Sequence, residues 1–175
     1  MKRISLALVA ALIMLAGCQS TGGPQVGKEV PSDGKYSLYM PGTPATKTQT
    51  IPSMAGPIDL HVYFFDEHGV RYILVYNDFP ATISQAAAVK TLLDSARNGA
   101  IEGFHGKLVK EDTITLTGNY PGRDIQVVSA DGKRALRSRM YVVKNRLYQI
   151  GIAVPTADLS TANTLKYLDS FKAHE

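Results

Sequence analysis

Residues 135–143 (ALRSRMYVV) and 147–154 (LYQIGIAV) lie on either side of the polar pair Lys144-Asn145. Both stretches are rich in aliphatic, β-branched and aromatic residues, and both have the length of an ordinary strand. A short polar break between two such runs is typical of a hairpin turn. This segment therefore predicts an antiparallel β-hairpin in the second half of the chain.

Further strands are predicted on the N-terminal side of this hairpin. In residues 58–65 the apolar residues alternate with their neighbours, which is the period of a strand with one buried face. The segments 67–69 and 131–132 contain the turn signals His68-Gly69 and Asp131-Gly132. The predicted strands are residues 36–40, 58–65, 70–76, 106–117 (with Ile114 and Leu116 inward), 124–129 after a turn at 118–122, 135–143 and 147–154. Residues 43–53 form either a strand or an extended loop.

Two helices are predicted from apolar residues that recur every three or four positions. The first covers residues 84–97, with an N-cap at Thr82 or Ser84 and a stop at Asn98-Gly99. The second covers residues 158–172. Their apolar stripes are Ala86, Val89, Leu93 and Ala96 in the first helix, and Ala162, Leu165, Leu168 and Phe171 in the second. Hairpin-connected strands with these two helices predict an α+β fold, in which an antiparallel β-sheet is flanked by helices.

The N-terminal segment resembles a bacterial lipoprotein signal. Lys2 and Arg3 precede an apolar run over residues 4–15, which is too short to cross a bilayer as a helix. The run ends in Leu15-Ala16-Gly17-Cys18, which matches the lipobox of an apolar residue, two small residues and cysteine. We expect residues 1–17 to be a signal peptide, with cleavage between Gly17 and Cys18 and lipidation of Cys18. The alternative is an ordinary secretory signal with a cysteine near its end.

A lipidated Cys18 predicts the lipid bilayer as a partner, because two or three acyl chains suffice for stable anchoring. Gln19 and Ser20 follow the cysteine. By resemblance to enterobacterial lipoproteins, the absence of an aspartate there predicts the outer membrane and its periplasmic face. Residues 18–35 are polar and rich in Gly, Pro and Ser, which predicts a flexible tether. Residues 36–175 then form one domain.

Composition and cysteine content restrict the function. The chain has 175 residues, 45% hydrophobic and 19% charged, which is typical of a globular domain. Loss of Lys2 and Arg3 with the signal reduces the net charge from +4 to +2, too little to indicate a nucleic-acid partner. Cys18 is the only cysteine. If it is lipidated, a disulfide, a cysteine metal cluster and a thiol nucleophile are all excluded.

The chain contains no compact catalytic motif. It has neither a Gly-x-Ser-x-Gly elbow nor a His-Glu-x-x-His segment nor a Gly-rich phosphate loop. His61 and His68 can approach across the predicted hairpin, but surface or core histidines are the better interpretation. We therefore predict no metal, no cofactor and no enzymatic activity.

Arginines on the late strands are the most distinctive polar feature. Arg137 and Arg139 are two positions apart and share a face with Tyr141, and Arg123 and Arg146 are expected nearby at turns. Arg123, Arg137, Arg139 and Tyr141 are the candidate binding face, which would hold carboxylates, phosphates or sugars. The alternative is a solvated face or an intramolecular network of ion pairs, for instance with Asp124.

The order of elements resembles the PsbP-like superfamily over residues 36–172. The similar segments are 36–42 (YSLYMPG), 121–123 (PGR), 148–150 (YQI) and 167–172 (YLDSFK). This resemblance implies an α/β/α sandwich and carries no shared active site, since family members of known role mostly act as binding or assembly subunits. We therefore expect a non-catalytic, membrane-anchored binding or assembly domain with an envelope protein or cell-wall ligand as partner. Two alternatives are an envelope enzyme with an unrecognised active site and a purely structural lipoprotein.

Overall fold

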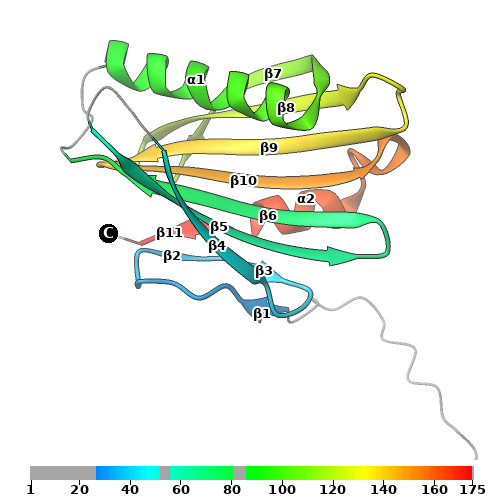
Figure 1. The fold of residues 1–175 in the computed structure, drawn as a ribbon, viewed down its shortest axis with the longest axis horizontal. Helices are drawn as coiled ribbons and strands as arrows, with labels where there is room; N and C mark the ends of the chain where they lie inside the picture. The colour runs from blue at the N-terminus through cyan, green and yellow to red at the C-terminus, as the bar shows by residue number, and fades with distance from the viewer. Residues whose placement is uncertain (1–26, 52–55, 81–85, 175) are drawn as a thin grey trace, which may run out of the picture.

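The computed structural model describes residues 27–51, 56–80 and 86–174, and its main element is a seven-stranded antiparallel sheet. The strands lie in the order β4-β5-β6-β10-β9-β8-β7 (Figure 1). Their bounds are β4 Ala45–Ile51, β5 Ile58–Glu67, β6 Val70–Asp78, β7 Gly106–Leu116, β8 Tyr120–Ser129, β9 Arg134–Val143 and β10 Arg146–Pro155. The predicted α+β class is confirmed, and residues 43–53 contain a strand.

The predicted hairpin, β9 and β10, lies in the interior of the sheet. Strand β10 pairs with β9 on one side and with β6 on the other, so that Tyr148 lies opposite both Tyr141 and Tyr76. The two strands are buried on both faces along much of their length. This position explains why their apolar residues are nearly continuous instead of alternating.

Positive backbone φ angles occur in the tight turns between the strands. His68 has a φ of 48° and Gly69 a φ of 78°, the combination that a two-residue hairpin turn requires. The turn predicted over residues 118–122 is shorter than expected, because Gly118 (φ 89°) and Asn119 (φ 62°) already reverse the chain. Strand β8 consequently begins at Tyr120 and includes Pro121 and Gly122.

Helix α1, Ala86–Phe104, packs on one face of the sheet against β7, β8 and β9. Val89, Leu93 and Ala96 of the predicted stripe are buried, whereas Ala86 is exposed. The stop predicted at Asn98-Gly99 is wrong, because Ala100, Ile101 and Phe104 continue the contact with the core. The helix ends where His105 takes a positive φ of 52°. Thr82 and Ser84 lie outside the described residues.

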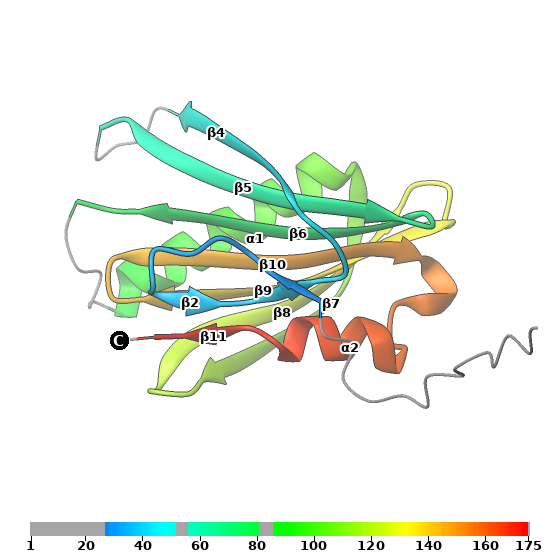
Figure 2. The ribbon, with the colours of Figure 1, turned by 90° about the horizontal axis from the view of Figure 1, so that it is seen from below.

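Helix α2, Ala162–Asp169, packs on the opposite face (Figure 2). The backbone N–H of Thr164 donates to the hydroxyl of the N-cap Thr161. The helix predicted over residues 158–172 is shortened at both ends, by a 3₁₀ turn at Thr156–Asp158 and by strand β11, Lys172–Ala173. Leu168 and Phe171 are buried as expected, while Ala162 is exposed.

The N-terminal segment of the described chain packs beneath the same face as α2. Strand β1, Lys28–Glu29, pairs with β3, Tyr39–Met40, and β2, Tyr36–Ser37, pairs with β11. The predicted strand 36–40 is thus split in two, and neither part joins the main sheet. Val30 is fully buried. The prediction of a tether through residue 35 is therefore wrong for residues 28–35, which belong to the folded domain.

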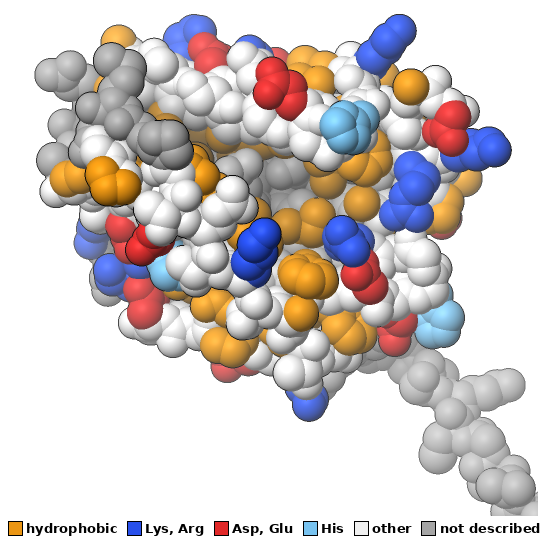
Figure 3. Space-filling model, in the orientation of Figure 1, with side chains coloured by type: hydrophobic (Ala, Val, Ile, Leu, Met, Phe, Trp, Pro, Cys, Tyr) orange, Lys and Arg blue, Asp and Glu red, His pale blue; other side chains and the backbone are white. Residues whose placement is uncertain are grey.

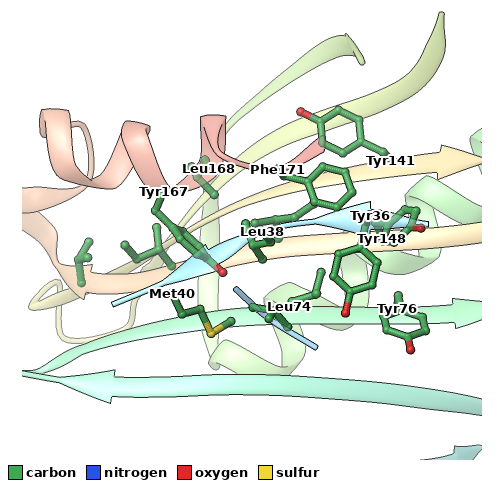
Figure 4. Close-up of a cluster of buried hydrophobic side chains, with 14 of the residues drawn as sticks. Tyr36, Leu38, Met40, Leu74, Tyr76, Tyr141, Tyr148, Tyr167, Leu168 and Phe171 are labelled. Carbon is green, nitrogen blue, oxygen red and sulfur yellow. The ribbon is translucent and has the colours of Figure 1, made fainter. Parts of the chain in front are cut away.

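The sheet separates two apolar layers. The larger layer lies between the sheet, α2 and the N-terminal strands, and Figure 4 shows its aromatic side chains converging there. Tyr36 contacts Tyr148, with ring centroids 5.7 Å apart, and Phe171 contacts Tyr148 at 5.0 Å. The smaller layer lies under α1 and includes Ile125 and Met140. Both faces are covered by helices, but to very different extents.

We expect Val30→Ala to lower the free energy of unfolding by about 2 kcal/mol, because it leaves a cavity in the core. Glu29→Ala, at an exposed position of β1, should have almost no effect. Urea denaturation of both variants measures the difference. Equal stabilities would show that this segment does not belong to the core.

Candidate functional site

Three of the predicted binding residues share one face of β9, as expected, but they bind other parts of the chain. Asp124 of β8 accepts hydrogen bonds from Arg137 (Nη2, 2.9 Å) and Arg139 (Nε, 3.1 Å). Arg139 Nη1 also donates to Asp169 of α2 at 2.5 Å. Tyr141 is buried and stacks on Phe171. The structure thus contains the ion-pair network that the sequence left as an alternative.

Arg123 does not belong to this face, and that part of the prediction is wrong. The register of β8 places Arg123 opposite Met140 and Gly122 opposite Tyr141. Arg123 therefore points to the α1 side of the sheet, where it pairs with Asp94 of the helix and with Glu111 of β7. It fastens α1 to the edge of the sheet.

Arg146 forms a separate ion-pair cluster at the start of β10. Its guanidinium donates two hydrogen bonds to Asp33 and two to Asp78, and lies 4.4 Å from the centre of the Tyr76 ring. These hydrogen bonds hold the pKa of Asp33 and the pKa of Asp78 below the ordinary value for aspartate. The cluster ties the N-terminal segment to the sheet.

The histidines do not form a metal site in the described part of the chain. His61 stacks on Tyr76 at 4.7 Å, whereas His68 lies in the β5–β6 turn, seven positions or about 23 Å further along. No group of three or more His, Cys, Asp or Glu side chains among the described residues is placed to hold a metal ion.

A cleft lies between α1 and the β4–β5–β6–β10 half of the sheet. Helix α1 contacts β7, β8 and β9, and the apolar side chains of the other strands face open space with a volume of about 1520 Å³. Figure 3 looks onto this hollow, in which hydrophobic side chains gather, with charged side chains along its rim. We call it the α1 cleft. We call the sheet side of this cleft its floor. It includes residues of β5, β6 and β10, namely Leu60, Val62, Ile73, Val75, Gln149 and Gly151.

Small residues line the helix side of the α1 cleft at intervals of one turn. They are Ala87, Thr91, Ser95, Gly99 and Gly103. The Thr91 and Ser95 hydroxyls donate to carbonyls of the preceding turn, which leaves this side weakly polar. A Cβ at Gly99 or Gly103 would meet no atom within 4 Å. Each glycine costs about 1 kcal/mol of helix stability relative to alanine, and the packing of the domain does not require either.

Asn77 is the unsatisfied polar residue of the cleft lining. Its side chain is on the α1 face of β6, the residue is 2% exposed, and its Nδ2 has no hydrogen-bond partner in the described part of the protein. A buried donor without an acceptor costs about 1–3 kcal/mol. This donor therefore marks a place where an acceptor from a ligand would be stabilising.

Charged groups at the opposite end of the cleft are already satisfied. Arg71 donates two hydrogen bonds to Asp66, at 2.7 and 2.8 Å, and these hold the pKa of Asp66 below its usual range. Arg134 donates to the carbonyl oxygens of Gly69 (2.8 Å) and Ala153 (3.2 Å). These contacts join the β5–β6 turn to β9 and β10.

Sequence reasoning missed the α1 cleft, although two signals were present. Ile58, Leu60 and Val62 alternate on β5 with His61, Tyr63 and Phe65, so both faces of this strand carry apolar or aromatic side chains. The predicted stop at Asn98-Gly99 also hid the regular spacing of the small residues along α1. The first signal indicates that the α1 side of β5 is apolar as well. The second indicates that one side of α1 carries only small residues and so leaves that sheet face partly uncovered.

Comparison with known proteins informs the fold. No protein-family model matches the chain, and no curated protein matches its sequence. The solution structure of cyanobacterial PsbP (CyanoP) from Synechocystis sp. PCC 6803 is similar, with a TM-score of 0.55 and 16% identity over 91% of this chain and 99% of that one. The chain has a PsbP-like fold. The predicted fold is thereby confirmed.

A crystal structure from Bacteroides thetaiotaomicron VPI-5482 is similar with a TM-score of 0.40 and 15% identity. The match covers 86% of this chain and 49% of that one, so the chain spans about half its length. Neither helix of the described PsbP-like domain is both long and apolar enough to cross a membrane.

We expect Gly99→Ala to raise the free energy of unfolding by about 1 kcal/mol, because it improves helix propensity without a clash. Gly106→Ala is the contrasting variant, since its Cβ would lie 2.6 Å from the Val128 carbonyl oxygen. It should be destabilising. Denaturant unfolding measures both, and a loss of stability in Gly99→Ala would show that the cleft side of α1 is not open.

Proposed function

We propose that this protein is a bacterial envelope lipoprotein whose PsbP-like domain binds an apolar ligand in the α1 cleft without catalysing a reaction. The observation that carries this proposal is the open, apolar cleft beside α1. Monomeric proteins rarely leave large contiguous apolar surfaces open unless something binds there. At about 1520 Å³ the cleft exceeds the 300–1,000 Å³ that is usual for small-molecule sites.

The chemistry of the cleft supports binding over catalysis. An enzyme needs two or more titratable groups that converge on a reacting atom. Asp66, Arg71 and Arg134 are the ionisable residues of the described lining, and all three lie at one end in mutual or backbone contacts. An envelope enzyme with an unrecognised active site remains the alternative, and it would place convergent titratable groups elsewhere.

The N-terminal segment supports the proposed location. The lipobox-like sequence ending in Cys18 suggests lipidation there, and Gln19 and Ser20 suggest transport to the outer membrane, with the domain on the periplasmic face. The nine residues from Cys18 to Val26 can span at most about 30 Å. The domain would therefore remain close to the membrane surface. A position close to the membrane and an apolar cleft together favour an apolar membrane component or an envelope protein as the partner, over a polar cell-wall glycan.

Cys18→Ala should abolish acyl labelling and leave unprocessed precursor in the cells. Metabolic labelling with a palmitate analogue, followed by mass measurement of the N-terminus, checks both effects. Ser20→Ala is the control and should be labelled and cleaved normally. A Cys18→Ala variant that is still cleaved would indicate an ordinary secretory signal.

The cleft is tested by the binding of 1-anilinonaphthalene-8-sulfonate, a dye that fluoresces in apolar sites. Gly99→Leu should weaken dye binding, because it adds a side chain to the cleft lining at a position where a Cβ meets no atom within 4 Å. Asn98→Leu places the same leucine side chain at an exposed position outside the cleft lining and should leave binding unchanged. Equal dye binding by Gly99→Leu and wild type would refute the proposed binding site.

A further inference from the structure

The α1 cleft also indicates the chemical class of its ligand. We infer that it holds the acyl chains of a diacyl phospholipid, with the chains along α1 and an ester carbonyl accepting a hydrogen bond from Asn77. This inference rests on the proposed function, because it names the ligand of the same site. It is carried by the length of the cleft, its volume and the unsatisfied amide at one end.

The length of the cleft suits acyl chains. The helix residues that line it run from Ala87 to Phe104, which corresponds to about 26 Å at 1.5 Å per residue. Half of a bilayer core of about 30 Å corresponds to roughly 15 Å for each acyl chain. A chain of membrane length therefore fits lengthwise, beside the open helix surface at Gly99 and Gly103.

The volume favours more than one chain. A cavity of about 150 Å³ holds one benzene molecule, or roughly 25 Å³ per carbon atom. A sixteen-carbon chain then needs about 400 Å³, whereas the cleft offers about 1520 Å³. A single fatty acid would leave most of the apolar surface exposed, but the two chains of a phospholipid would cover much more of it.

Asn77 sets the orientation of the lipid. At the other end of the cleft, Arg71 is paired with Asp66 and Arg134 with two backbone carbonyls, so these groups already have partners. Among the described side chains of the cleft lining, the buried donor that lacks an acceptor is Asn77 Nδ2. The polar end of the lipid therefore lies near Asn77, and the chain ends point toward Phe104.

A partner helix is a weaker occupant than a lipid. An amphipathic helix could lie in an apolar groove, and the spacing of the small residues along α1 would permit its close approach. The backbone carbonyls of an α-helix, however, are engaged in its own hydrogen bonds except in the last turn. Each ester of a phospholipid presents a free carbonyl beside the first carbon atoms of its chain, which is the combination that Asn77 and the apolar floor require.

The test compares two lipids that differ only in their carbonyl groups. The probes are dipalmitoyl phosphatidylethanolamine and its dihexadecyl ether analogue, each with the same fluorophore on the head group. The protein is the full chain carrying Cys18→Ala, so that it bears no acyl chains at Cys18. We expect the ester lipid to bind about 3–10-fold more tightly than the ether lipid. Equal affinities would overturn the role of Asn77.

Asn77→Leu separates the hydrogen bond from the apolar contacts. Leucine has a similar size and removes the buried donor, so the variant should fold, as a thermal melt followed by circular dichroism will show. Its affinity for the ester lipid should fall to that of the ether lipid, and its affinity for the ether lipid should not fall. An undiminished preference for the ester lipid in this variant would refute the inference.

Gly99→Leu and Asn98→Leu distinguish failure of the cleft as a binding site from failure of a phospholipid as its ligand. Gly99→Leu should weaken the binding of both lipids, and Asn98→Leu should bind both like the parent chain. Dye binding that depends on Gly99 without binding of either lipid would keep the proposed function and overturn the lipid ligand, leaving a partner helix as the next candidate. Tighter binding of palmitate than of the diacyl lipid would likewise overturn it in favour of a free fatty acid.

Discussion

A sheet of seven strands has two wide faces, and helices α1 and α2 cover them unequally in the described structure. Backbone pairing of the strands is satisfied within the sheet, but their apolar side chains still need cover. On one face, α2 joins β1, β2, β3 and β11 to enclose a large aromatic core. On the other face, α1 lies over β7, β8 and β9 and leaves the remaining strands beside an open cleft. The unequal cover is the constraint from which the candidate site follows.

Ion pairs keep this arrangement in place. Arg123 joins α1 to β7 and β8, Asp124 joins β8 to β9 through two arginines, and Arg146 joins β10 to β6 and to the N-terminal segment. Arg146 is 4% exposed, so loss of either of its aspartate partners would leave a buried charge poorly compensated. The arginines that suggested a ligand face thus have a structural task, which is to fix how elements meet across the sheet.

The open side of α1 is maintained at a cost to local stability. Two glycines within a helix and one buried amide without a partner are each unfavourable in the isolated domain. All three line the same cleft, whose other lining residues are mostly apolar. Features that oppose stability and converge on one place are expected at functional sites. This convergence is why we assign the function to the cleft. The predicted arginine face is less suitable, because each of its arginines already lies within hydrogen-bonding distance of a carboxylate.

The sequence alone determined most strands of the main sheet, the approximate positions of both helices and the α+β class, because these depend on local periodicity and turn chemistry. It left β4 undecided, misjudged the ends of both helices and did not indicate β1 or β11. It also contained the lipobox-like signal at Cys18, which is purely local. Tertiary structure decided what the side chains do. The register of β8 on β9 placed Arg123 away from Arg137 and Arg139, and the burial of Val30 extended the domain before residue 36. The site itself could not be predicted, since a cleft exists only where an apolar strand face and a helix fail to meet. That depends on where α1 lies across the sheet, which is a property of packing between residues far apart in the chain.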